Sequence, residues 1–234
     1  KLNASIPESA KDEAIKKVLR SFIQNQIVDN QQFHKFLVEG VPVEYRKDSG
    51  IKGDFVKLVD FENPEKNEFL AINQFTIIEN KYNRRPDIIL FINGLPLVIF
   101  ELKNPAEEKA TITDAFQQLK NYKDQIPSLF RFNEILIISD GIQTEAGTMS
   151  LNRDRFMPWK SINGKIHETG VSLEILCKGM LNKETLLDLI KNFIVFEKEE
   201  TLNKKLGAYH QYNAVNKALT STIKATRGDK KAGV

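Results

Sequence analysis

One stretch of the chain, residues 84–105, constrains the fold more than any other part of the sequence. It reads RRPDIILFINGLPLVIFELKNP, in which two apolar runs, 88–92 and 95–100, flank the pair Asn93-Gly94. An Asn-Gly pair between apolar runs is a strong short-range signal for a β-hairpin. Both runs are apolar at nearly every position, so both faces of the two strands should be buried. The sequence therefore predicts a hairpin inside a sheet.

Charged residues stand at the open end of this hairpin. Asp87 precedes the first apolar run, and Glu101 and Lys103 end the second. Charges at the rim of a buried strand are costly unless they are paired or bind a metal ion. A divalent cation that also binds a DNA phosphate would compensate them.

Asp87 and Glu101 can share a cation only if their side chains lie on the same face of the sheet, and the alternation of side chains along a strand decides this. Glu101 and Lys103 are two residues apart and share a face of the strand, while Leu102 points to the other face. A plain two-residue loop would pair Asp87 with Phe100 and would put Asp87 and Glu101 on opposite faces. A loop with an odd residue count, or a β-bulge, brings the carboxylates together. We predict that one of these corrections exists.

The residue types suit metal-dependent phosphodiester hydrolysis. Two carboxylates can hold Mg²⁺, with waters and a substrate phosphate completing the octahedron. The cation polarises the scissile phosphate and lowers the pKa of a bound water. Lys103 can orient the attacking water or neutralise the transition state.

The tripeptide Glu-x-Lys is not specific by itself. It occurs three times, at residues 79–81, 101–103 and 107–109, and only the middle copy ends an apolar strand. On residue types alone an alternative stays open, in which Asp87 caps a strand and Glu101 and Lys103 form a surface ion pair.

A helix with Gln118 and Tyr122 on one face is predicted at residues 111–126, with Thr111 or Thr113 as its cap and Pro127 after its end. An amide and a phenol together can bridge a metal-site carboxylate, a strand end and a DNA phosphate. The alternative is a tyrosine that packs the helix, beside a glutamine that faces solvent.

The rest of the chain predicts an α/β fold, a mixed central β-sheet flanked by helices. Helical spacing occurs in residues 1–40, where Ser9 or Asp12 could cap the first helix, and again in the tail at 184–196 and 209–224, separated by a charged break. Strands are expected at 41–46, 55–61, 69–78 and 134–139, with an edge strand at 156–162.

Composition excludes several classes of protein. With 41% hydrophobic residues and 15 Phe among 234 residues, the chain can bury a substantial core. Its one cysteine, Cys177, excludes an intrachain disulfide framework, fits a reducing cytoplasm and is expected to be a small buried hydrophobe. The net charge of +3 does not establish a nucleic-acid partner by itself. There is no zinc-site spacing, no phosphate-binding loop of either common type, and no apolar run long enough for a membrane span.

The order Asp87, Glu101-x-Lys103, Gln118-x-x-x-Tyr122 resembles the PD-(D/E)xK nuclease core, in the branch with an added Gln/Tyr helix motif. From about residue 3 to its end the chain is similar to the amino-terminal region of the R (restriction and translocation) subunit of type I restriction-modification enzymes. The strings that carry this likeness are residues 67–75, 84–105, 118–122, 127–130 and 156–159.

The resemblance implies roles for particular residues. Asp87, Glu101 and the backbone carbonyl of Leu102 would be Mg²⁺ ligands, and Lys103 the catalytic lysine. Gln118 and Tyr122 would be auxiliary residues whose loss impairs cleavage. Arg84 and Arg85, beside Asp87, are candidate DNA phosphate contacts, with surface charges as the open alternative.

The resemblance also implies a domain order. An N-terminal helical segment at 1–40 would precede an endonuclease domain at 41–180, followed at 181–234 by a helical linker and the start of an ATP-dependent translocase. Tyr209 and Gln211 are similar to the stretch that contacts adenine in the first motor lobe, so ATP would bind only in a full-length protein. We expect the chain to be a truncation that ends before the phosphate loop.

The favoured interpretation is a Mg²⁺-dependent endonuclease domain that cleaves duplex DNA, with ATP-driven translocation and with specificity and methylation subunits as partners, in the cytoplasm and without a membrane. Two alternatives stay open. The region could be a non-catalytic scaffold that docks the motor to the other subunits, or a standalone repair nuclease with the same core.

Overall fold

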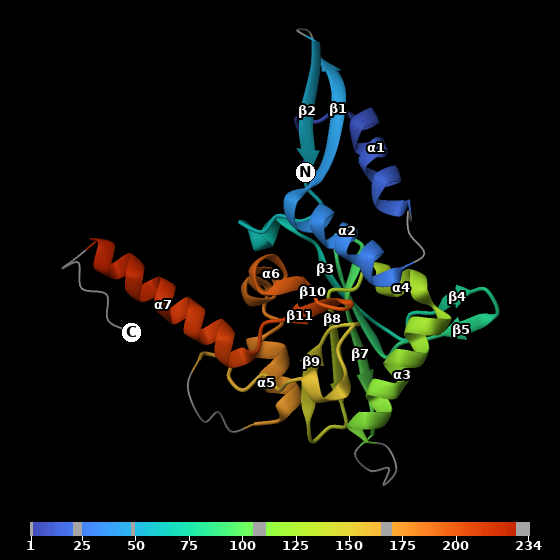
Figure 1. Ribbon diagram of the computed structural model, residues 1–234, viewed down its shortest axis with the longest axis vertical. Coiled ribbons are helices and arrows are strands. Elements are labelled where there is room, and N and C mark those ends of the chain that lie inside the picture. The colour runs from blue at the N-terminus through green and yellow to red at the C-terminus, as the bar shows by residue number, and fades with distance from the viewer. Residues whose placement is uncertain (1, 21–24, 48–49, 105–110, 165–169, 228–234) are drawn as a thin grey trace.

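A mixed sheet of five strands forms the centre of the computed structural model, which describes residues 2–20, 25–47, 50–104, 111–164 and 170–227 (Figure 1). Its order is β3-β6-β7-β8-β9, and only β7 and β8 run parallel. The predicted α/β class with a mixed central sheet is therefore confirmed. The bounds are β3 Phe69–Asn73, β6 Ile88–Ile92, β7 Leu95–Leu102, β8 Ile135–Ser139 and β9 Thr144–Gly147.

The predicted hairpin is formed by β6 and β7, and it contains a β-bulge, one of the two features predicted to bring Asp87 and Glu101 to the same face. Asn93 and Gly94 have φ angles of 51° and 81°, as a two-residue type I′ turn requires, and Ile92 pairs with Leu95. The register then shifts, because Phe91 pairs with Pro96 and Leu90 with Val98, which leaves Leu97 as a bulge. Beyond the last pair, Ile88 with Phe100, the next residues are Asp87 and Glu101.

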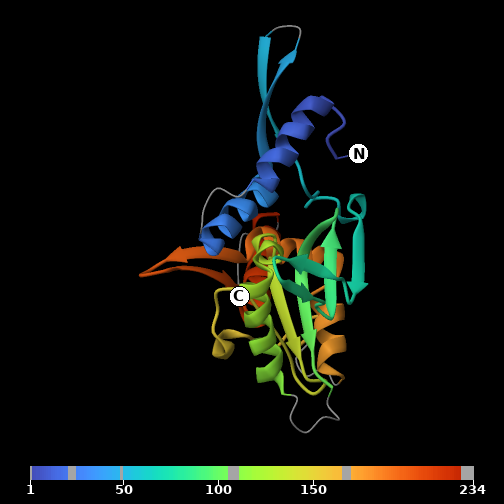
Figure 2. The ribbon, with the colours of Figure 1, turned by 90° about the vertical axis from the view of Figure 1, so that its right-hand side faces the viewer.

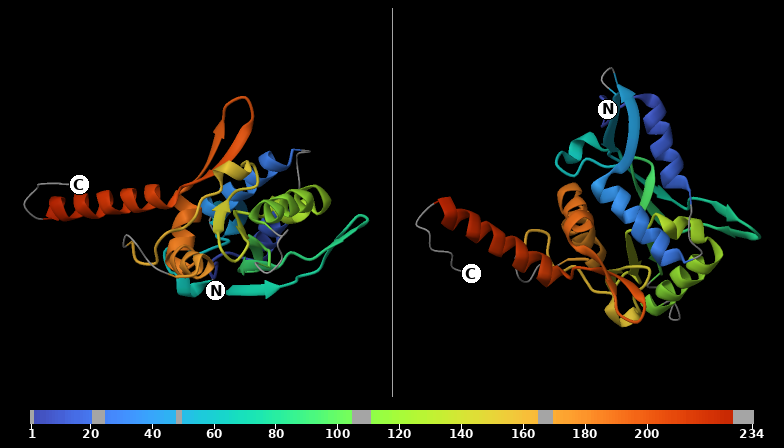
Figure 3. Two further views of the ribbon diagram at one scale, coloured as in Figure 1. Left: turned by 90° about the horizontal axis from the view of Figure 1, so that it is seen from below. Right: turned by 45° about the horizontal axis from the view of Figure 1, so that its top comes forward.

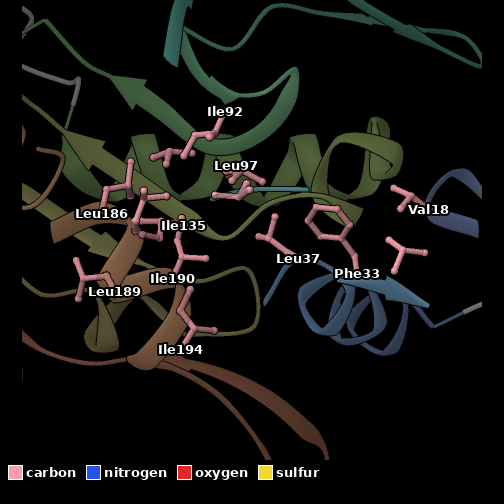
Figure 4. Close-up of a cluster of buried hydrophobic side chains, with 14 of the residues drawn as sticks. Val18, Phe33, Leu37, Ile92, Leu97, Ile135, Leu186, Leu189, Ile190 and Ile194 are labelled. Carbon is pink, nitrogen blue, oxygen red and sulfur yellow. The ribbon is translucent and has the colours of Figure 1, made fainter. Parts of the chain in front are cut away.

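Helices cover both faces of the sheet. The helices α3 (Ile112–Gln125) and α4 (Pro127–Arg131) pack on the face that carries Ile89, Ile99 and Ile138. The other face packs against α2 (Gln26–Glu39) and α6 (Lys183–Asn192), and Figure 4 shows Leu37 of α2 toward Leu97, and Leu186 and Ile190 of α6 around Ile135. Because strand side chains alternate between faces, Glu101 lies on the α3 side with Ile99, and Leu102 packs on the other side.

Two segments extend from this body. The hairpin of β1 (Val41–Lys47) and β2 (Gly50–Val56) rises beside α1 (Glu8–Leu19), as Figures 1 and 2 show. At the other end of the chain, α7 (Tyr209–Arg227) projects away from the sheet (Figures 1 and 3). Neither Ser9 nor Asp12 caps α1, because the helix begins after Pro7, whose carbonyl accepts hydrogen bonds from Ala10 and Lys11.

Several predicted strands differ in the structure. The strand expected at 69–78 ends at Asn73, because Gln74 is left-handed with a φ angle of 53°, and the chain continues into a separate hairpin of β4 (Ile77–Glu79) and β5 (Tyr82–Arg84). The strand expected at 55–61 is only the end of β2. The edge strand expected at 156–162 is reduced to one bridge between Met157 and Ala146, because Pro158 has no N–H to continue the ladder. Two short 3₁₀ helices complete this part, η1 Pro64–Lys66 and η2 Arg153–Arg155.

The tail also corrects the prediction. The helix expected at 184–196 ends at Asn192, and the charged break is a hairpin of β10 (Ile194–Lys198) and β11 (Leu202–Leu206), which stands out from the body in Figure 2. Cys177 is exposed on α5 (Ser172–Gly179), because Ile175, Leu176 and Gly179 form the buried face of that helix. None of the helices in the described ranges is long and apolar enough to cross a membrane.

Candidate functional site

The predicted carboxylates meet where β6 begins and β7 ends. The bulge at Leu97 adds one residue to β7, so Asp87 lies across from Glu101 rather than from Phe100. Glu101 is 4% exposed, whereas Asp87 is half-buried at the margin of the sheet. The two side chains thus share the sheet face that α3 covers, as the prediction requires.

The Asp87 carboxylate is held through both of its oxygens. Oδ2 accepts a hydrogen bond of 2.8 Å from the Leu102 N–H, and Oδ1 accepts one of 2.8 Å from Gln74 Nε2. A strand residue directs its N–H and its C=O toward the same neighbouring strand. The Leu102 carbonyl, which the sequence analysis named as a metal ligand, therefore faces the side of Asp87.

Only one of the two Glu101 carboxylate oxygens accepts a hydrogen bond from Lys103. Oε1 lies 2.9 Å from Lys103 Nζ, and Oε2 is buried with no hydrogen-bond partner among the residues that the structure describes. Burial raises the pKa of Glu101 to about 7, and the charge of Asp87 adds to this although Lys103 opposes it. Burial alone would lower the pKa of Lys103, but the hydrogen bond and charge of Glu101, together with Asp87, raise it above its usual value.

This donor set fits a hard divalent cation. Its possible oxygen ligands are the carboxylates of Asp87 and Glu101 and the Leu102 carbonyl. Within the described ranges no group of three or more His, Cys, Asp or Glu side chains could hold a metal ion. Mg²⁺ is commonly bound by one or two carboxylates plus substrate phosphates, with waters completing its shell. A buried carboxylate oxygen without a partner, Glu101 Oε2, is the atom that a cation would satisfy.

Helix α3 brings Gln118 and Tyr122 to the same region. The helix begins with a capping box in which Thr111 and Asp114 bond to each other's backbone, which decides between the two caps predicted. Tyr122 is buried, and its hydroxyl donates to the Arg85 carbonyl at 3.5 Å. Burial raises the pKa of Tyr122, and the charge of Glu101 adds to this although a hydrogen bond from Gln118 opposes it, so the phenol stays neutral and can donate.

A polar cavity of about 370 Å³ lies beside Asp87. Arg84 and Arg85 are on its wall, together with five amide side chains and Tyr122. Arg84 Nε donates to Gln125 Oε1 at 2.5 Å, which fixes the guanidinium against α3, and Arg85 is exposed. The amides that line the cavity are Gln74, Asn83, Gln118, Asn121 and Gln125.

Comparison with known proteins places this chain in a family. The family described as type I restriction enzyme R protein N terminus matches residues 1–155. The chain belongs to this family. Its relatives include the HindI endonuclease subunit of Haemophilus influenzae, 46% identical over 243 residues, which span 100% of this chain and 23% of that protein. A putative type I restriction enzyme endonuclease subunit of Methanocaldococcus jannaschii, MjaIXP, is 36% identical over 86% of this chain and 21% of its own length. The chain thus spans about a quarter of the length of these relatives.

In this type I R protein region, Tyr209 and Gln211 lie apart from the carboxylates. They line a second cavity of about 870 Å³, together with Trp159, Phe193 and Lys205. The Tyr209 ring packs edge-on against Trp159, with 5.3 Å between centroids, and Gln211 Oε1 accepts a hydrogen bond from the Ala208 N–H at the start of α7. Nucleotide binding by these two residues stays a prediction.

One residue that contacts the candidate site, Gln74, was not predicted from the sequence. Gln74 contacts Asp87 directly, but the prediction of one strand over 69–78 placed it inside that strand. The sequence could have pointed to Gln74 only as a polar residue opposite Asp87. That inference requires the register of β3 against β6, in which Asn73 pairs with Ile88, and the register is not evident from the sequence.

Proposed function

We propose that this chain is a nuclease domain that hydrolyses phosphodiester bonds of duplex DNA with Mg²⁺, within a type I restriction enzyme R subunit. The observation that carries the proposal is the placement of Asp87 across from Glu101, with Lys103 Nζ 2.9 Å from one Glu101 oxygen and the other oxygen left without a described partner. The chain's relatives are named endonuclease subunits of type I restriction enzymes, which agrees with it.

Asp87, Glu101 and the Leu102 carbonyl would hold the cation. A bound Mg²⁺ would polarise the scissile phosphate and lower the pKa of a bound water. Gln74 and the Leu102 N–H fix the orientation of Asp87, and burial among strands fixes Glu101.

Lys103 acts as a fixed positive charge in this proposal. Its pKa is raised by Glu101 and Asp87, although burial opposes them, so the ammonium keeps its proton at neutral pH. A protonated lysine cannot accept a proton from water, but it can neutralise negative charge that develops on the phosphate. A protonated lysine can also orient the attacking water by donating a hydrogen bond to it, so its environment agrees with both roles predicted for Lys103.

Helix α3 and the β5–β6 connection would contact the DNA strand. The neutral Tyr122 hydroxyl and the Gln118 amide can donate to a phosphate oxygen, and Arg85 is exposed at the same cavity. ATP-driven translocation, and partnership with specificity and methylation subunits in the cytoplasm, belong to the proposal through the resemblance to type I R subunits. They would involve parts of an R subunit that these 234 residues do not span.

The test is cleavage of site-containing duplex DNA by the full-length R subunit in its assembled complex, with ATP and Mg²⁺. Asp87→Ala and Lys103→Ala should abolish cleavage while ATP hydrolysis persists. Lys81→Ala is the matched control, because it changes the lysine of another Glu-x-Lys tripeptide that lies at the exposed β4–β5 turn. Wild-type cleavage by Lys103→Ala would refute the catalytic assignment. A complex that never cleaves but needs this region for assembly would indicate the docking scaffold.

A further inference from the structure

Gln74 extends the row of site residues across the sheet. It follows the last residue of β3, and its N–H donates a hydrogen bond of 3.0 Å to the Asp87 carbonyl. Since Asp87 in turn lies across from Glu101, the three residues stand next to one another at one edge of three adjacent strands, β3, β6 and β7.

The Gln74 side chain contacts Asp87 a second time. Its Nε2 donates to Oδ1 at 2.8 Å, while the Leu102 N–H donates to Oδ2 at 2.8 Å from the opposite side. Two donors, one directly after β3 and one on β7, therefore fix the plane of this carboxylate. An ionised carboxylate has about four acceptor positions, so these two bonds leave room for a cation.

The backbone of Gln74 is unusual for its residue type. Among the residues that the structure describes, three other than glycine have positive φ angles, Gln74 at 53°, Asn80 at 51° and Asn93 at 51°. Asn adopts the left-handed conformation readily because its short side chain bonds to the local backbone, whereas Gln does so rarely. Left-handed residues of this kind concentrate at functional sites, where surrounding contacts hold them in place.

We propose that Gln74 is a positioning residue of the nuclease site, which orients the Asp87 carboxylate for cation binding through its side-chain amide. This inference rests on the proposed function, because it takes Asp87 to be a metal ligand. Gln74 does not itself need to contact the cation or the DNA. Residues that hold a metal ligand in place change metal affinity or activity by about 10-fold to 100-fold when they are replaced.

The experiment is a titration of the full chain with Mn²⁺, followed by electron paramagnetic resonance of the free ion. Gln74→Met keeps the length of the side chain and removes the donor, and Gln74→Gly also removes the side chain from a left-handed position. Asn80→Gly is the matched control, because it makes the same backbone change at a φ angle of 51° in the β4–β5 turn. Asp87→Ala tests the metal site itself.

We expect both Gln74 variants to bind Mn²⁺ about 10-fold more weakly than the wild type, and Asn80→Gly to bind as the wild type does. In the assembled complex, Gln74→Met should raise the Mg²⁺ concentration needed for half-maximal cleavage, with unchanged KM for DNA. A residue that only fills space would tolerate methionine in both measurements.

The outcomes separate the two proposals. Wild-type Mn²⁺ affinity in Gln74→Met, with binding lost in Asp87→Ala, overturns the role of Gln74 and leaves the proposed function intact. Wild-type affinity in Asp87→Ala overturns both. If Gln74→Gly does not fold, the Gln74→Met measurement still decides.

Discussion

Glu101 and Lys103 meet through only one carboxylate oxygen: Oε1 lies 2.9 Å from Lys103 Nζ, and the described residues provide no hydrogen-bond partner for the buried Oε2. An ion pair that satisfies half of a buried carboxylate leaves part of the desolvation free energy uncompensated. The charge of Glu101 is therefore unfavourable in the metal-free chain, and this has a measurable consequence for stability.

The first prediction concerns the pH dependence of the unfolding free energy. The pKa of Glu101 rises from 4.5 to about 7 on folding, chiefly because the group is buried, so the folded chain holds this proton more tightly than the unfolded chain does. The resulting stabilisation is fully present below pH 4.5 and is lost as the pH rises through 7. Glu101→Gln removes the titration, so its stability relative to the wild type should increase by roughly 3 kcal/mol between pH 4 and pH 8.

Urea unfolding in the presence of a chelator measures this difference. Glu68→Gln, at an exposed position just before β3, is the control and should show no such trend. A pH profile that is the same in Glu101→Gln and the wild type would contradict the prediction.

The second prediction concerns the Tyr122 hydroxyl. Tyr122→Phe removes a neutral donor that reaches the Arg85 carbonyl at 3.5 Å, a long and weak bond, so the unfolding free energy should fall by less than about 1 kcal/mol. DNA cleavage in the assembled complex should fall by about 10-fold, because the donor lies on the cavity beside Asp87. Tyr45→Phe makes the same chemical change on β1, where the hydroxyl donates to Asp54, and should leave cleavage unchanged. Equal cleavage by both variants would remove Tyr122 from the site.

Local sequence patterns predicted the central hairpin and which of its side chains share a face of the sheet. The apolar runs and Asn93-Gly94 placed β6 and β7, and the side-chain period required a bulge if Asp87 and Glu101 were to meet. The sequence also held a signal for the position of that bulge. Proline within a sheet is tolerated mainly at edges and bulges, and Pro96 directly precedes the bulged Leu97 in a central strand.

Features that depend on distant partners could not be predicted. The left-handed backbone of Gln74 could not be predicted, because glutamine, unlike glycine or asparagine, rarely adopts this conformation. The hydrogen bonds that hold it there are made with Asp87, which is distant in the sequence. Lys204 stands in the charged break predicted between the two tail helices, yet it is 0% exposed. Its carboxylate partner, Glu134, is 70 residues away in the sequence, so no local pattern could reveal the pair.

The third prediction tests the turn of the central hairpin. Asn93 is left-handed, and its side chain bonds to Leu58, Asn67 and Glu68 at 2.8–2.9 Å. Asn93→Gly keeps the backbone conformation and loses three hydrogen bonds, for a loss of about 2–3 kcal/mol. Asn93→Ala loses the same bonds and adds roughly 1 kcal/mol for a left-handed alanine. Denaturant midpoints of the two variants measure the difference, and equal midpoints would contradict the backbone contribution.

The fourth prediction concerns the buried pair of Lys204 and Glu134. Lys204 Nζ lies 2.6 Å from Glu134 Oε2 and also bonds to Asn30 Oδ1 and the Asn133 carbonyl, and both charged side chains are 0% exposed. Burial lowers the pKa of Lys204, although the charge of Glu134 opposes this. Lys204→Met would leave the buried Glu134 carboxylate without its cation, with His34 Nδ1 at 2.9 Å from Oε2 as its remaining side-chain partner, so the unfolding free energy should fall by about 3 kcal/mol.

A double-mutant cycle separates this penalty from the net contribution of the pair. Glu134→Gln in the Lys204→Met background should recover part of the loss, because no buried carboxylate then lacks its cation, and the coupling should exceed about 1 kcal/mol. The neighbouring Lys205 is exposed on the same strand and pairs with Glu197, so Lys205→Met should change stability by less than about 1 kcal/mol. Additive effects of Lys204→Met and Glu134→Gln would mean that the pair does not act as a unit. Because Lys204 lies on β11, Asn30 on α2 and Glu134 directly before β8, strong coupling would also show that this pair stabilises the packing of the β10–β11 hairpin against β8, the neighbour of β7.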